Sequence, residues 1–367
     1  MDRKVENYVK GDKTMKIKLA ILEKDTSYLN RIVAVFSTKY ADKFEVYSFT
    51  DQMIAISALE GARIDVLLAS DSFEIDGAVL PKRCSFAYFV DSPDIDAFNG
   101  EKAICKFQKV DLIYKQILSV YSENAGKVSG LKLGDDTTQV IVFSSPNGGC
   151  GNSAMAAACA MYFSKNRKKT LYLNLENFGG ADCFFYGEGQ FDMSDAIFAL
   201  KSKKANLSMK LESCVKQGEQ GVFFYSQSKV ALDMLELTTD DMLRFVTELK
   251  LTGNYDYIII DMDFSLSKDV LNLYRQAHGL VWVGNGSETS NNQIVRAFQA
   301  LSIIEQNAEA PLTQRLSLIY NKFSNKTSKV IGDIGLRNIG GVPRYEHANE
   351  KQVVEQLANM NLFEKII

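Results

Sequence analysis

The sequence predicts an α/β protein built from two doubly wound sheets with mostly parallel strands. Three observations support this prediction. Short apolar runs typical of strands alternate with helical patterns, a polar and glycine-containing stretch near 124–136 divides the pattern in two, and the second part opens with a strand, a glycine-rich turn and a helix of small residues. A length of 367 residues is enough for about two domains.

Composition and charge exclude several classes of protein. Hydrophobic residues make up 46% of the chain, which is enough for ordinary cores, and the formal net charge of −3 argues against a surface that binds nucleic acid throughout. The 6 cysteines show no CxxC spacing, which favours free thiols in a reducing cytoplasm. No segment reaches the roughly 18 apolar residues of a membrane span. We therefore expect a cytoplasmic protein with no membrane span and no direct nucleic-acid partner.

The pattern divides the chain into a tail at 1–14, a first domain at 15–123, a linker at 124–136 and a second domain at 137–367. In the first domain, apolar runs predict five strands, with a helix after each. These strands are expected at 16–22, 45–49, 65–70, 85–90 and 103–105. Five such units in about a hundred residues predict a flavodoxin-like doubly wound sheet.

Polar residues at the strand ends give the first domain a resemblance to the receiver domains of response regulators. Glu23 and Asp25 follow the first strand and Lys106 follows the fifth, where that family carries an acidic pair and a lysine. Ser70 stands at the position of the phosphoacceptor aspartate, and Asp71 lies one residue beyond it. Because side-chain direction alternates along a strand, this shift points the carboxylate elsewhere. We expect a pseudo-receiver used for protein contact; phosphorylation at Asp71 is the alternative.

A phosphate site is predicted where the second domain begins. The strand at 140–143 leads into a turn that contains Gly148, Gly149 and Gly151, and a helix follows from about Ala154. Glycines let the backbone approach an anion closely, and a helix amino terminus directs free N–H groups and a positive dipole end at it. A glycine turn with no ligand is the alternative.

The loop resembles the deviant Walker A motif of the MinD/ParA group of P-loop ATPases, which reads K-G-G-x-G-K-[ST]. The corresponding residues, with the one that follows, are Asn147, Gly148, Gly149, Cys150, Gly151, Asn152, Ser153 and Ala154. The resemblance implies that these residues bind ATP and that the Ser153 hydroxyl binds Mg²⁺. Both lysine positions are asparagine, which cannot supply a charge to the phosphates or to an opposite subunit. We therefore expect ATP binding to persist and hydrolysis to be weak or absent.

Further motifs of the same group follow in order. Glu176 stands in the first switch segment, where its carboxylate could orient or deprotonate water, and it is the candidate catalytic residue; a solvated strand end is the alternative. A buried strand ends in Asp261, the Walker B pattern, so Asp261 is the second candidate ligand of Mg²⁺. Asn321 matches the asparagine that reads adenine, and Pro343 and Arg344 match the loop that covers the base.

The order of the two domains resembles the TadZ/CpaE proteins of Tad (Flp) pilus assembly. This resemblance implies an ATP-binding localisation scaffold that forms a homodimer at the cell pole, with other pilus-assembly or secretion proteins, or a pole-marking protein, as partners. The alternative is an active MinD/ParA-type ATPase in DNA segregation or division-site placement, which should carry a basic surface or tail. Reductase-type iron proteins need cluster cysteines, and Cys183 and Cys214 show no such spacing.

The end of the chain carries a helical stripe of apolar residues, Val354, Leu357, Phe363 and Ile366. A membrane-binding tail would be basic, whereas this segment contains few cations. We expect the stripe to pack into the core.

Overall fold

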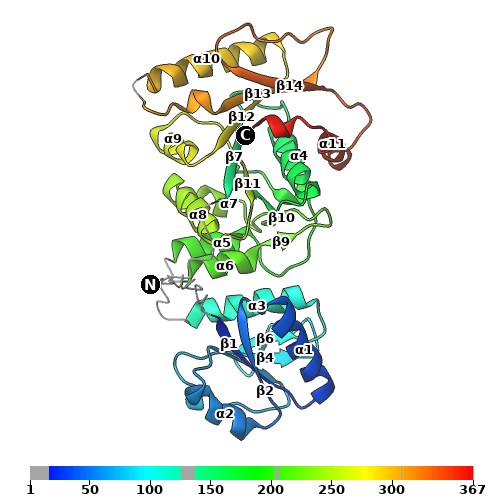
Figure 1. Cartoon of the computed structure of the whole chain (residues 1–367), viewed down its shortest axis with the longest axis vertical. Helices are drawn as coiled ribbons and strands as arrows, with labels where there is room; N and C mark the ends of the chain where they lie inside the picture. The colour runs from blue at the N-terminus through cyan, green and yellow to red at the C-terminus, as the bar shows by residue number, and fades with distance from the viewer. Residues whose placement is uncertain (1–15, 125–136, 203–205, 307, 367) are drawn as a thin grey trace, which may run out of the picture. The chain divides into compact units, whose positions relative to one another are not determined.

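The computed structural model describes residues 16–124, 137–202, 206–306 and 308–366 (Figure 1). The chain divides into two compact units, Met1–Leu133 and Gly134–Ile367. The expected tail at 1–14 and the linker beyond Asn124 lie outside the described residues. Each unit is a largely parallel sheet with helices on both faces, so the predicted α/β fold class is confirmed.

In the first unit the strand order is β2-β1-β3-β4-β6-β5. The first five strands of this order are parallel, which is the flavodoxin-like arrangement, and β5 runs antiparallel to β6. Helices α1 and α3 share one face, where the rings of Tyr40 and Tyr114 stack 4.3 Å apart, and α2 buries Ala55 and Leu59 on the other. The elements are β1 (Ile17–Leu22), α1 (Thr26–Lys39), β2 (Phe44–Phe49), α2 (Gln52–Gly61), β3 (Val66–Ser70), β4 (Ser85–Val90), β5 (Ala97–Phe98), β6 (Glu101–Cys105) and α3 (Val110–Asn124).

The prediction of a helix after every strand of this unit is wrong after β3 and after β4. The chain forms only a 3₁₀ turn, Gly77–Val79, after β3, and it forms the hairpin of β5 and β6 after β4. The hairpin turns at Asn99 and Gly100, which both have positive φ, 51° and 82°. An Asn-Gly pair is a strong sequence signal for a two-residue hairpin, and it outweighs the alternation of strands and helices here.

In the second unit the strand order is β14-β13-β12-β7-β11-β8-β10-β9, and only β9 and β10 are antiparallel to each other. The strands are β7 (Gln139–Ser144), β8 (Thr170–Asn174), β9 (Lys216–Gln217), β10 (Phe223–Phe224), β11 (Tyr257–Asp261), β12 (Gly279–Gly284), β13 (Leu316–Phe323) and β14 (Arg337–Pro343). The helices are α4 (Asn152–Lys165), α5 (Met193–Lys201), α6 (Leu207–Cys214), α7 (Leu232–Leu235), α8 (Thr239–Leu251), α9 (Lys268–Arg275), α10 (Glu288–Ile304) and α11 (Glu350–Leu357).

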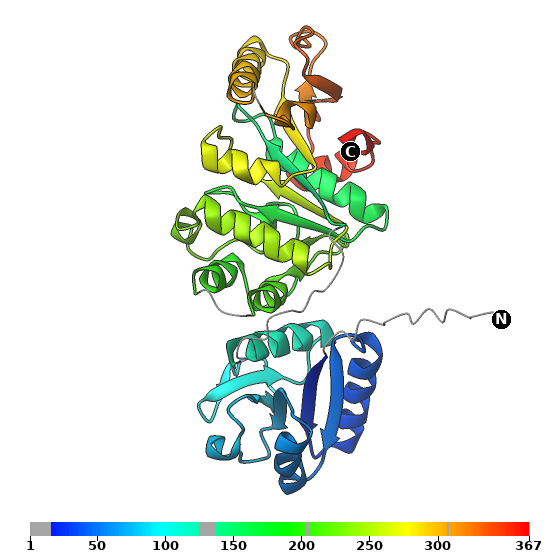
Figure 2. The ribbon, with the colours of Figure 1, turned by 60° about the vertical axis from the view of Figure 1, so that its left-hand side comes forward.

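Two apolar cores lie on the two faces of this sheet, because successive side chains of a strand point to opposite faces. Val140 and Val142 of β7 join the core under α5, α6, α8, α9 and α10, whereas Ile141 and Phe143 join the core under α4 and α11. Figure 2 shows α8 and α9 on the opposite side of the sheet from α4. The residues on which the site depends are thus held by a sheet that is buried on both faces.

Helix α4 is enclosed by protein, since every residue from Met155 to Phe163 is buried. Its alanines allow the close packing of α4 against the sheet and against α11. Val354, Leu357, Phe363 and Ile366 are all buried in the same core, so the predicted core packing of the terminal stripe is confirmed. In the ranges that the structure describes, no helix combines the length and the apolar character needed to cross a membrane.

Candidate nucleotide-binding site

The glycine-rich loop lies between β7 and α4, and it borders a cavity of about 500 Å³. This volume is typical of pockets for small ligands. Of the predicted site residues, the cavity is lined by Asn147, Gly148, Gly149, Cys150, Gly151, Asn152, Ser153, Ala154, Glu176, Asn321 and Arg344. Asp261 and Pro343 do not line it. The fold therefore brings most of the predicted residues to one hollow, although they come from four separate parts of the sequence.

The backbone of the loop has the form that an anion site needs. Gly151, the N-cap of α4, has φ of 84°, and no side chain caps the helix. The first N–H groups of α4 are thus left without a capping side chain, as at helix termini that bind phosphate. A Cβ at Gly151 would lie 2.4 Å from Nδ2 of Asn321. Only glycine fits both the conformation and the space.

The two asparagines at the lysine positions make local contacts. The side chain of Asn147 is buried, and its Oδ1 lies 3.1 Å from the hydroxyl of Ser145, which can donate to it. Asn152 Nδ2 donates to Oδ1 of Asp261 at 2.8 Å. Neither side chain carries charge toward the cavity, so the phosphate-facing part of the loop depends on backbone N–H groups and on Ser153.

Asp261 lies behind the loop and has no exposed surface. Its Oδ1 accepts from Asn152, and its Oδ2 accepts from Tyr172 at 2.7 Å and from Asn174 at 2.9 Å. Burial, followed by the nearby negative charge of Glu176, raises the pKa of Asp261 above its ordinary value. Burial also raises the pKa of Tyr172, which therefore stays a phenol and a donor. The carboxylate anchors a buried polar network.

Of the two predicted carboxylates, Glu176 is the one that lines the cavity. Its two oxygens accept from the hydroxyl of Ser153 at 3.2 and 3.1 Å, and Oε2 also accepts from Nδ2 of Asn174 at 3.1 Å. A Cβ at Gly179 would lie 2.4 Å from Oε2, so the switch backbone packs closely on this carboxylate. The backbone N–H of Asn177 donates to Asp263 at 3.0 Å, which joins the segment after β8 to the segment after β11.

Asn321 lies on the opposite side of the loop and is also engaged with it. Its Nδ2 donates to the carbonyl of Cys150 at 2.8 Å, and its Oδ1 accepts from the backbone N–H of Lys322 at 2.9 Å. An amide has two donor hydrogens and two acceptor lone pairs, so one of each remains for a ligand. Asn321 can therefore support the loop and contact a base at the same time.

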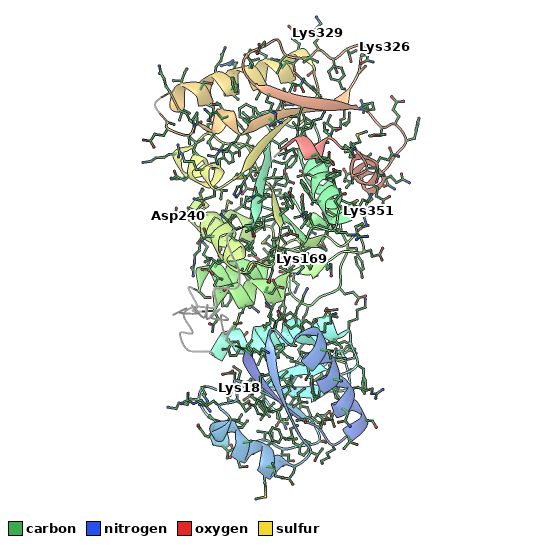
Figure 3. All side chains as sticks on the ribbon, viewed as in Figure 1. Lys18, Lys169, Asp240, Lys326, Lys329 and Lys351 are labelled. Carbon is green, nitrogen blue, oxygen red and sulfur yellow. The ribbon has the colours of Figure 1, made fainter. Side chains whose placement is uncertain are left out.

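Sequence reasoning missed several residues that line the cavity. They are Ser145, Phe184, Met262, Asp263, Phe264, Lys322, Tyr345, Ala348, Glu350 and Val353. Lys322 is the most informative of them, because its Nζ donates to the carbonyl of Gly149 at 3.0 Å and it follows Asn321 directly. The exposed Lys326 and Lys329 lie farther along the segment after β13 (Figure 3) and do not line the cavity.

The first unit holds a second group of predicted residues. Lys106 pairs with the buried Glu23 at 3.2 Å and with Asp91 at 2.8 Å. Ser70 is buried, and its hydroxyl lies 3.4 Å from Oδ1 of Asp71. The lysine that would meet an acyl phosphate is thus paired with other carboxylates. The pseudo-receiver stays a prediction, with phosphorylation of Asp71 as its alternative.

A comparison with protein families identifies the first unit. Residues 15–122 match the model described as the TadZ-like receiver domain. The first unit is a TadZ-like receiver domain. This match agrees with the flavodoxin-like strand order and with the residue pattern that resembled receivers. No curated protein matches the chain.

Each of the following similar solved structures spans about three-fifths of the chain. A ParA family ATPase from Chlorobium tepidum TLS is 20% identical, with 63% of this chain and 97% of that chain covered and a TM-score of 0.49. The MinC:MinD cell division complex from Aquifex aeolicus is 17% identical, with 61% of this chain and 97% of that chain covered and a TM-score of 0.44. MinD complexed with Mg-ADP from Pyrococcus horikoshii OT3 is 14% identical, with 60% of this chain and 94% of that chain covered and a TM-score of 0.45.

Proposed function

We propose that the chain is an ATP-binding scaffold of Tad (Flp) pilus assembly that hydrolyses ATP weakly or not at all. The observation that carries this proposal is the union of a TadZ-like receiver domain with a phosphate-type loop that has lost both lysines. In such sites, stabilising charge on the transferring phosphoryl group supplies most of the catalysis. A loop that keeps its backbone N–H groups but not its cations is suited to holding a nucleotide.

The residues present fit ATP with Mg²⁺. The uncapped start of α4 suits phosphate, and the Ser153 hydroxyl is a hard oxygen ligand of the kind that Mg²⁺ prefers. Oδ1 of Asn152 is buried and has no hydrogen-bond partner among the described residues, so it can accept from a bound ligand or its water. Bound Mg²⁺ would neutralise phosphate charge. Asn321 and Arg344 would hold the base end, with Pro343 supporting Arg344 from β14.

The remaining parts of the proposal concern the cell. We place the protein in the cytoplasm, concentrated at the pole, as a homodimer that contacts other pilus-assembly or secretion proteins or a pole-marking protein. The receiver-like domain would serve as a contact surface, since its Lys106 is already paired with Glu23 and Asp91. A DNA-segregation or division-site ATPase is less favoured, because such a protein has to turn its nucleotide over.

Calorimetric titration of the full chain with ATP and Mg²⁺, beside a phosphate-release assay, tests the nucleotide part. We expect binding in the micromolar range, weakened in Ser153→Ala but not in Ser302→Ala on the outer helix α10, and no release above background. Robust release that Glu176→Gln reduces would contradict the scaffold. If neither the parent nor either variant binds ATP, the loop is a glycine turn without a ligand.

A further inference from the structure

Two carboxylates lie near Ser153, and they have different environments. Asp261 ends β11, and Glu176 follows β8 in the first switch segment. Sequence motifs assign the metal to Ser153 and Asp261. The structure allows that assignment to be tested against burial and hydrogen bonding, residue by residue.

Asp261 has little capacity left for a cation. Both of its oxygens accept hydrogen bonds, one from Asn152 and two from Tyr172 and Asn174, at 2.7 to 2.9 Å, and a further hydrogen bond comes from the Ser153 hydroxyl. Its side chain has no exposed surface and does not line the cavity. A carboxylate offers about four lone-pair positions, and at least three are used here. A metal ion could reach Asp261 only by displacing these partners.

Glu176 is differently placed. It lines the cavity, and its oxygens lie 3.1 and 3.2 Å from Oγ of Ser153. Adjacent oxygen ligands of an octahedral Mg²⁺ are about 3 Å apart, because each lies about 2.1 Å from the ion. In the free protein the hydroxyl donates hydrogen bonds to the carboxylate at these distances, and the same spacing suits two neighbouring ligands of the ion.

Asn152 supplies a second, independent sign of a ligand at this place. Its Nδ2 is held by Asp261, while its Oδ1 is buried without a partner in the part of the chain that the structure describes. A buried acceptor without a donor is unfavourable unless a ligand or a bound water completes it. Asp261 thereby fixes the direction in which this free oxygen points.

The protein alone does not form a metal cage. Among the described residues, no group of three or more His, Cys, Asp or Glu side chains is arranged to hold an ion. Mg²⁺ usually combines one or two carboxylates with phosphate oxygens and water. Glu176 and Asp263 also oppose the entry of a bare triphosphate, because the loop itself brings no cation beside Ser153, whereas Lys322 contacts the loop at Gly149. Metal and nucleotide should therefore bind together.

We infer that Glu176, and not Asp261, is the carboxylate that meets the divalent cation of the bound nucleotide, and that Asp261 is a positioning residue for Asn152 and Asn174. This inference rests on the proposed nucleotide site. It turns the candidate catalytic glutamate into a metal ligand, and it makes ATP affinity depend on a divalent cation.

The test is calorimetric titration of the full chain with ATP, with and without Mg²⁺, supported by the electron paramagnetic resonance signal of free Mn²⁺ in the presence of ATP. For the parent we expect Mg²⁺ to raise ATP affinity at least 10-fold. In Glu176→Gln this increase should fall to less than 3-fold. The affinity for ATP without metal should equal or exceed that of the parent, because a repelling charge is gone. General damage to the fold would lower both affinities.

Asp261→Asn and Tyr172→Phe should keep the metal-dependent increase within about 2-fold of the parent, with a lower thermal midpoint. Tyr172→Phe serves if Asp261→Asn fails to fold, since it removes one donor to Asp261 and leaves the cavity lining unchanged. Loss of the increase in either folded variant, or its retention in Glu176→Gln, overturns the inference. If the parent binds no ATP with or without metal, the proposed nucleotide site fails first.

Discussion

Restoring the lost lysine in Asn152→Lys is the sharpest perturbation of the loop. The asparagine lies 2.8 Å from the buried Asp261 and borders the cavity that also holds Glu176. A lysine there would face two carboxylates in the free protein and the phosphates in the complex. One charge-assisted hydrogen bond to phosphate is worth about 1.5–3 kcal/mol, which corresponds to about a 10-fold to 150-fold gain in ATP affinity.

The assay is calorimetric titration with ATP and Mg²⁺, with Asn166→Lys as the matched control. Asn166 is exposed at the other end of α4, so the control adds the same charge to the same helix away from the cavity. We expect a gain for Asn152→Lys only. An affinity equal to that of the parent, in a variant whose thermal midpoint is undiminished, would refute the idea that phosphate lies on this loop.

Three further predictions concern backbone, pH and the receiver domain. Gly151→Ala should lower the free energy of unfolding in urea by at least about 1 kcal/mol and abolish ATP binding, because φ is 84° and the new Cβ would meet Asn321. The control is Gly148→Ala, whose new Cβ has nothing within 4 Å and should change the unfolding free energy little. Equal losses in the two variants would contradict this prediction. Burial raises the pKa of Asp241, but the hydrogen bond from Lys201 of α5, followed by those from Thr238 at the start of α8, lowers it by more. The stabilising effect of Asp241 therefore exists above the unfolded-state pKa and is lost in acid. Asp241→Asn should therefore lower the unfolding free energy by about 1 kcal/mol at pH 7 and by nothing near pH 2, unlike Asp240→Asn on the outside of the same helix (Figure 3); a pH-independent difference would count against this assignment. Acetyl phosphate should not label the full chain in a mass spectrum, and labelling that disappears in Asp71→Ala would show an active receiver.

The strands and the loop could be predicted because their signals are local. The apolar runs around 140–143 and 257–260 identify strands that are buried on both faces, and glycines followed by small residues identify the turn into α4. The same holds for the first unit, except where the Asn99-Gly100 hairpin replaces a helix. The preference of the Asn-Gly pair for a two-residue turn there outweighed the alternation of strands and helices.

The direction of individual side chains could not be predicted, because it depends on neighbours from distant strands. The end of β11 places Asp261 correctly, but Tyr172 of β8 and Asn152 of α4 determine that its oxygens are occupied. Lys322 was missed for a similar reason. Its ammonium reaches the loop only because β13 brings it beside Gly149, which is more than a hundred residues away in sequence.

The central claim is that this chain holds ATP without consuming it. The most direct measurement is to incubate the full chain with a stoichiometric amount of ATP and Mg²⁺ for several hours, separate the protein-bound nucleotide by rapid gel filtration, and identify it by ion-exchange chromatography. We predict that the bound nucleotide is recovered as intact ATP in the parent, and that Ser153→Ala retains less of it. Recovery of ADP, at a rate that Glu176→Gln slows, would contradict the account.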